Sequence, residues 1–149
     1  MKNFFSFLFI IFLSTGAHSF ENTKIKIGDF FIHKYEVTIK EFQNYADKSN
    51  YKTLAETNGG GYEWGAGWEK RNGWNYKTPY GSKPQSLLEP AVHINRFEAE
   101  NYCKSINGRL PSFSEWKVAA YKQSLPSTKF TTNKTYRYPS GDKAENMNS

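Results

Sequence analysis

The chain has 149 residues, a formal net charge of +6 at pH 7 and an aromatic fraction of 17%. Aromatic residues at this level favour a packed domain over a disordered chain, because each ring buries a large apolar area. The 20 Lys and Arg residues are scattered and form no basic stripe, so we expect a solvated basic surface and no nucleic-acid partner.

The N-terminus has the composition of a secretory signal peptide. Lys2 precedes the apolar run 4–13, and Ala17-His18-Ser19 places small residues at the two cleavage positions. The apolar run is shorter than the about 20 residues of a membrane-spanning helix. We therefore expect a signal peptide over residues 1–19, no stable membrane anchor after cleavage, and an exported domain over residues 20–149. The compartment would be the periplasm or the extracellular space; an uncleaved anchor is the alternative.

Three helices are predicted from their start signals. In a capping box, a Ser, Thr or Asn side chain accepts from the first turn of the helix, and a Glu three residues later reaches back to the cap backbone. This role accounts for each Glu without any catalytic function. The predicted pairs are Thr38 with Glu41, Asn95 with Glu98, and Ser112 with Glu115.

The ends and faces of these helices follow from the same pattern. The first helix should end near Ser49-Asn50, and the second should end with Gly108 in the left-handed conformation. Cys103 lies on the apolar face of the second helix and should point toward the core. The third helix should bury Trp116, Ala119 and Ala120.

The strand signals are weaker than the helix signals. Residues 25–32 alternate apolar and polar side chains around Gly28-Asp29, which favours a short hairpin. Residues 35–37 are expected to extend its second strand. Residues 91–94 form a short apolar run, and residues 129–138 are expected to form a late strand or hairpin.

Residues 58–90 form a long segment rich in Gly, Trp, Tyr and Pro, without helical or strand periodicity. Two interpretations are open for its rings. They fill the core beneath the loop, which we prefer because a Gly-rich loop needs such packing. Alternatively, they form a surface platform that binds sugar rings or peptides. The platform residues would be Trp64, Trp68 and Trp74, with Tyr62 and Tyr76.

Several blocks together carry a family resemblance. They include Lys34–Thr38 followed by Glu41-Phe42, Gly108–Pro111 followed by Glu115-Trp116, and Tyr138–Asp142. In this order they resemble the N-terminal half of the sulfatase-modifying-factor (formylglycine-generating-enzyme-like) family. The resemblance implies an α+β, irregular C-type-lectin-like fold with long aromatic loops, present here as a truncated domain over residues 20–149.

The resemblance also implies a chemistry. Family members that generate formylglycine oxidise a cysteine in a sulfatase motif, with copper held by a cysteine pair of the C-terminal half. This chain has Cys103 alone, so we expect a fragment or divergent member without oxidase activity by itself, and we assign no catalytic residue and no cofactor to it. In some members the cysteine matching Cys103 pairs with a C-terminal cysteine. The family further implies calcium, for which Asn146 is the candidate ligand.

Two functions from different classes remain. The chain is an exported domain that modifies or recognises a protein, or it is a binding module for carbohydrate or protein that uses loop 58–90. Arg109 is a candidate binding residue, because a guanidinium beside a helix start suits carboxylate or carbonyl groups. A buried structural ion pair is the preferred interpretation for Arg109. A conventional hydrolase is disfavoured, since the chain has no Gly-x-Ser-x-Gly or His-Glu-x-x-His motif.

Overall fold

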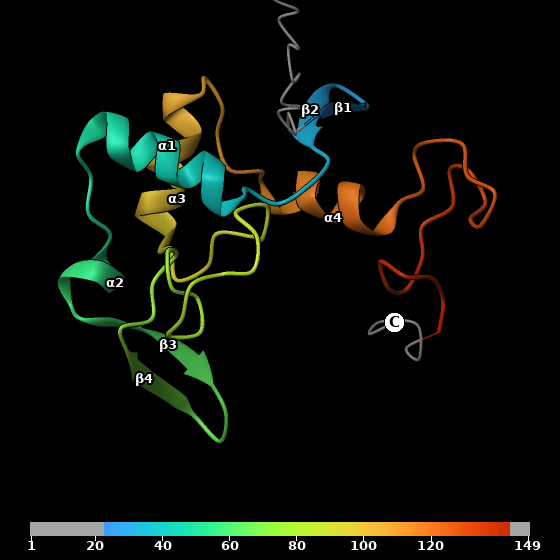
Figure 1. Cartoon of the computed structure of the whole chain (residues 1–149). Helices are drawn as coiled ribbons and strands as arrows, with labels where there is room; N and C mark the ends of the chain where they lie inside the picture. The colour runs from blue at the N-terminus through green and yellow to red at the C-terminus, as the bar shows by residue number, and fades with distance from the viewer. Residues whose placement is uncertain (1–22, 144–149) are drawn as a thin grey trace, which may run out of the picture.

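The computed structural model describes residues 23–143 as a mixed arrangement of helices and small antiparallel sheets (Figure 1). The predicted signal peptide and Asn146 lie outside these residues, so both stay predictions. The α+β class is confirmed, whereas the lectin-like detail stays a prediction. The elements in chain order are β1 (Lys24–Ile27), β2 (Phe30–His33), α1 (Ile39–Ser49), α2 (Leu54–Thr57), β3 (Gly60–Trp64), β4 (Trp68–Asn72), α3 (Arg96–Ser105) and α4 (Phe113–Tyr121).

The strands form two separate two-stranded sheets. β1 pairs with β2 and β3 pairs with β4, both antiparallel. In Figure 1 the β1–β2 hairpin lies above α4, and the β3–β4 hairpin projects from the other end of the molecule below α2. Among residues 23–143, no helix has the length and apolar character needed to cross a membrane.

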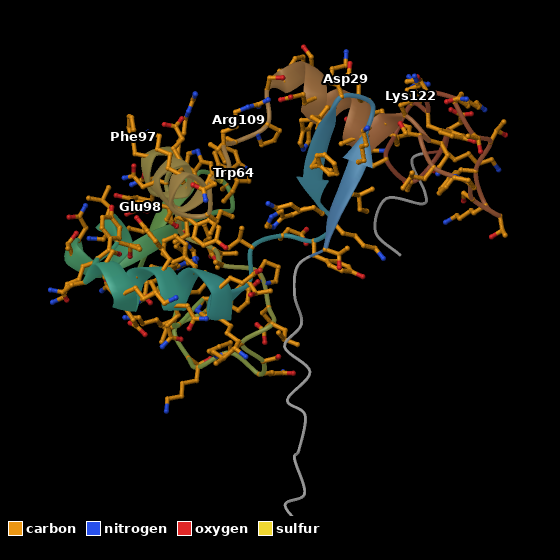
Figure 2. The ribbon with its side chains drawn as sticks, turned by 90° about the horizontal axis from the view of Figure 1, so that it is seen from above. Asp29, Trp64, Phe97, Glu98, Arg109 and Lys122 are labelled. Atoms are coloured by element: carbon orange, nitrogen blue, oxygen red, sulfur yellow. The ribbon has the colours of Figure 1, made fainter. Side chains whose placement is uncertain are left out.

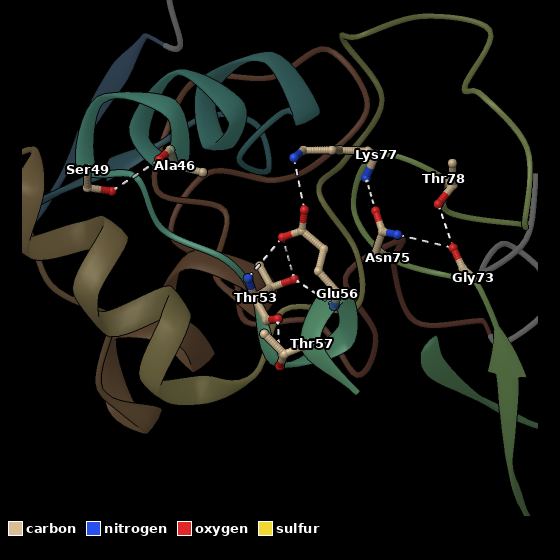
Figure 3. Close-up of polar contacts among 9 residues, drawn as sticks. All are labelled: Ala46, Ser49, Thr53, Glu56, Thr57, Gly73, Asn75, Lys77 and Thr78. Atoms are coloured by element: carbon tan, nitrogen blue, oxygen red, sulfur yellow. Dashed lines mark hydrogen bonds and ion pairs between the residues drawn. The ribbon is translucent and has the colours of Figure 1, made fainter. Parts of the chain in front are cut away.

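All three predicted capping boxes are present, and the structure contains a fourth. At each predicted start, the cap side chain accepts from the backbone of the Glu three residues on, and that Glu accepts from the cap backbone. The fourth box joins Thr53 to Glu56 and starts the short helix α2 (Figure 3). Its Thr-Leu-Ala-Glu sequence carries the same signal as the others, but α2 has only four residues, too few to show a helical period.

The end of α3 corrects one prediction. The residue in the left-handed conformation is Asn107, at φ 56°, and not Gly108. The Asn107 amide donates to the Lys104 carbonyl at 3.1 Å, and the Gly108 amide donates to the Cys103 carbonyl at 2.8 Å. These two bonds form a Schellman motif, in which the left-handed residue precedes the one that closes the outer bond. Asn tolerates this conformation better than most residues, so the helix ends one residue earlier than expected.

The core lies between α1 and α3 and includes one ring from the long loop. Its buried residues are Ile39, Phe42, Ala46, Tyr76 and Tyr102. The Tyr76 ring packs edge-on against Phe42 at a centroid distance of 4.9 Å. Cys103 packs against this cluster from α3, as the helical spacing predicted. The preferred interpretation of the aromatic loop therefore holds for Tyr76.

Other predictions about strands and burial are wrong. β2 ends at His33, so residues 35–37 do not extend it; residue 37 instead accepts from the amide of Ala91. Residues 129–138 form no strand, only isolated bridges. Helix α4 forms as predicted, but it buries no residue, and Trp116 is 45% exposed. The helix lies at the margin of the α1–α3 core (Figure 1), where few described residues cover it.

The long segment 58–90 contains a hairpin that its residue pattern did not predict. β3 and β4 pair from Gly60 opposite Asn72 to Trp64 opposite Trp68. The local signal was the Gly-Ala-Gly turn at 65–67 with a tryptophan on each side. Two further contacts fix the following loop, because Lys77 bonds Glu56 of α2 at 2.9 Å and Thr78 donates to the Gly73 carbonyl at 2.6 Å (Figure 3).

Candidate functional site

A cavity of about 750 Å³ lies between β2, the C-terminal end of α3 and the start of α4. Most of its lining is apolar, with contributions from Phe30, Val37, Ile106, Leu110 and Trp116. In Figure 2 the β1–β2 hairpin, with Asp29 at its turn, lies beside α4. A cavity of this size suits a small ligand or a short peptide segment.

Cys103 lines this cavity and is the single cysteine of the sequence. The residue is half-buried, and burial raises the pKa of its thiol. The thiol is therefore neutral at physiological pH and a poor nucleophile, since nucleophilic attack requires the thiolate. Its geometry is that of a packing residue at the edge of the core.

Arg109 and Glu115 form an ion pair at the rim of the cavity. Two guanidinium nitrogens contact the two carboxylate oxygens at 2.7 and 2.6 Å. These hydrogen bonds, with that from the Ser112 amide, lower the pKa of Glu115 to about 2. The predicted structural pair exists, but it is not buried, because Arg109 is 67% exposed. Glu115 also completes the capping box of α4, so the Arg109 guanidinium stabilises the start of that helix.

The β3–β4 hairpin carries an exposed aromatic face. Trp64 and Trp68 lie directly opposite each other, with ring centroids 5.3 Å apart and planes at 71°. They are 66% and 70% exposed. Tyr62 lies on the same face, because alternate residues of a strand share a face, and it is also exposed. The core interpretation is therefore wrong for these three rings.

Trp74 does not join this aromatic face. It is half-buried and packs against Tyr80 and His93, each at a centroid distance of 5.6 Å. The His93 ring in turn lies so close to Gly61 that a Cβ on that glycine would stand 2.3 Å from the ring nitrogen. Trp74 thus packs at the base of the hairpin. Of the three tryptophans predicted to form one platform, only Trp64 and Trp68 lie together.

The residues present do not fit the copper site that the family resemblance implies. Copper(I) is suited by paired soft thiolates, and the sequence supplies a single thiol. Among residues 23–143, no group of three or more His, Cys, Asp or Glu side chains is placed to hold a metal ion. Among the described residues, the acid nearest in sequence to Asn146 is Asp142, which is paired with Lys134 at 2.7 Å.

Comparison with known proteins gives one family and two relatives. The family model of the sulfatase-modifying factor enzyme 1-like domain matches residues 12–149. A Bos taurus protein named inactive C-alpha-formylglycine-generating enzyme 2 is 29% identical over 156 residues, covering 82% of this chain and 50% of the relative. The Mus musculus protein of the same name is 27% identical over 154 residues, covering 82% and 49%. The chain thus spans about half the length of the curated relatives it matches.

Proposed function

The chain belongs to the sulfatase-modifying factor enzyme 1-like domain family, and from this premise we propose that it is an exported member that recognises a polypeptide without oxidising it. The observation that carries the proposal is the state of its one thiol. Cys103 is half-buried, has a raised pKa and has no second cysteine in the chain with which to form a pair. The names of the two relatives, both called inactive, support the absence of oxidase activity.

The lack of oxidase activity is tested with a synthetic peptide carrying a sulfatase-type cysteine motif. The chain is incubated with the peptide, copper(I), a thiol reductant and air, and the peptide is followed by mass spectrometry. We expect the peptide cysteine to stay unconverted beyond the rate seen without protein. The matched control is Cys103→Ser, which should give the same background. Conversion by the wild-type chain that disappears in Cys103→Ser would refute the proposal.

Export is the second part of the proposal, and the order of residues in 1–19 supports it. The test is N-terminal sequencing of the protein recovered from the periplasmic or culture fraction. We expect the sequence to begin at Phe20. An intact Met1 in the membrane fraction would support the uncleaved anchor instead.

A second candidate function is a carbohydrate-binding module that uses the aromatic face of the β3–β4 hairpin. The favouring observation is the exposure of Trp64 and Trp68 on one face, since sugar rings stack on exposed aromatic surfaces. The planes of the two rings meet at 71°, so they form a corner that receives one sugar ring and not a flat platform for a chain. Trp74, which packs elsewhere, would contribute nothing to this site.

Tryptophan fluorescence titrated with oligosaccharides tests this candidate. We expect a saturable change that is lost in Trp64→Ala and in Trp68→Ala. Tyr80→Ala is the matched control, because Tyr80 is exposed but packs against Trp74 away from the hairpin face. A titration that stays flat for every oligosaccharide removes this candidate and leaves the polypeptide-binding proposal standing.

A further inference from the structure

The cavity beside β2 runs along an unpaired strand edge. All residues from 30 to 37 line it, whereas β1 contributes only Lys24. Within β2, Phe30–His33, successive side chains point to opposite faces, so all four residues can line one cavity only when it reaches the edge of the strand. The opposite edge of β2 is occupied by β1. The cavity therefore follows the free edge of the β1–β2 sheet.

The register shows which backbone groups face this cavity. In an antiparallel pair, hydrogen-bonded and non-hydrogen-bonded residue pairs alternate. The Lys34 amide donates to the Thr23 carbonyl at 3.0 Å, which makes the next pair, Lys24 opposite His33, a non-hydrogen-bonded one. By the same alternation, the amide and carbonyl groups of Phe31 and His33 point away from β1 and toward the free edge. Neither residue has a backbone partner there among residues 23–143.

A strand edge of this kind pairs with an extended peptide. Added strands gain main-chain hydrogen bonds from the edge, and alternate side chains enter neighbouring pockets. Here the pocket beside the edge is mostly apolar and is lined by Trp116 and Cys103. The charged residues that line it are Lys24, Lys34 and Glu36, together with Arg109 and Glu115, which pair with each other.

We propose that the free edge of β2 binds an extended, apolar and acidic peptide segment of a protein partner, which adds as a third strand. Its backbone pairs with Phe31 and His33, one large apolar side chain enters the cavity beside Cys103, and its acidic residues lie near Lys24 and Lys34. This inference rests on the proposed function, since it gives the recognised polypeptide a binding mode and a chemical class.

The test uses a phage-displayed library of random 12-residue peptides against three forms of the chain. His33→Pro removes the amide that faces the free edge, and proline is tolerated at such a position because the amide makes no ladder bond. His33→Ala is the matched control, because it removes the same side chain and keeps the amide. Selection on the wild type should enrich apolar, acidic sequences, and their synthetic forms should bind His33→Ala normally and His33→Pro at least tenfold more weakly.

Two further measurements keep the outcome decisive. Far-UV circular dichroism must show that His33→Pro folds as the wild type does; if it does not, a peptide N-methylated at alternate backbone positions replaces the variant, and it should lose binding. A bound peptide should also slow alkylation of Cys103. The proposal is overturned if no peptide is enriched. It is also overturned if enriched peptides bind equally well when the main-chain hydrogen bonds are removed, or if they do not slow the alkylation of Cys103. None of these binding measurements depends on oxidation of a cysteine peptide, so they can fail or succeed independently of the oxidase assay.

Discussion

Replacing Tyr76 tests how the long loop is fixed to the core. Its side chain is fully buried between α1 and the loop, and its ring stacks edge-on against Phe42. A ring of this size buries roughly 150 Å² of apolar surface, and at about 25 cal/mol per Å² its removal costs about 4 kcal/mol. Tyr76→Ala should therefore lower the free energy of unfolding by about 3–5 kcal/mol, as for other buried aromatics.

Removing only the hydroxyl of Tyr76 should have the opposite effect on stability. It is buried and makes no hydrogen bond of normal geometry among the described residues, although the neighbouring Lys77 ammonium interacts with it. A buried hydroxyl without a partner costs roughly 1–3 kcal/mol. Tyr76→Phe keeps the ring and removes the hydroxyl, so it should leave stability unchanged or raise it by about 1 kcal/mol.

Urea unfolding followed by circular dichroism measures both changes. Tyr62→Ala is the control, because Tyr62 is exposed on the β3–β4 hairpin and its removal should shift stability by less than about 0.5 kcal/mol. The argument fails if Tyr76→Ala is as mild as the control. It also fails in part if Tyr76→Phe lowers the free energy of unfolding by more than 1 kcal/mol, because the hydroxyl then has a partner.

Three further outcomes are expected. Arg109 lowers the pKa of the Glu115 carboxyl from 4.5 to about 2, so the small contribution of this surface ion pair to stability is full above pH 4.5 and is lost as the pH falls toward 2. Glu115→Gln lacks the ion pair, so its stability should not fall between pH 4.5 and 2 for this reason. A variant with the same acid-unfolding curve as the wild type would contradict the assignment. Gly61→Ala should displace the β3–β4 hairpin and lower the melting temperature by several degrees, because its Cβ would stand 2.3 Å from a histidine ring nitrogen. Gly67→Ala is the control and should leave the melting temperature unchanged, because a Cβ there would meet no atom within 4 Å. Cys103 should react with iodoacetamide more slowly than a free cysteine at pH 8, since burial raises its pKa, and equal rates would show an open, solvated thiol.

The sequence alone determined where the helices begin. A capping box needs only residues three positions apart, so its chemistry is complete within one turn and does not depend on the rest of the fold. The hairpin around Gly28-Asp29 is local in the same way, and Gly28 takes the positive φ of 57° that its turn requires. The family followed from blocks of this short-range kind.

Burial and the candidate binding surfaces were decided by the tertiary structure. Tyr76 and Trp64 lie in one aromatic segment with no periodicity to separate them, yet one is fully buried and the other is exposed. The difference depends on which ring faces Phe42, a residue more than thirty positions away. Likewise, the free edge of β2 exists only because α3 and α4 leave a cavity beside it, and side-chain patterns carry no information about backbone groups at an edge. Contacts between distant segments set these features, and such contacts are absent from any local stretch of sequence.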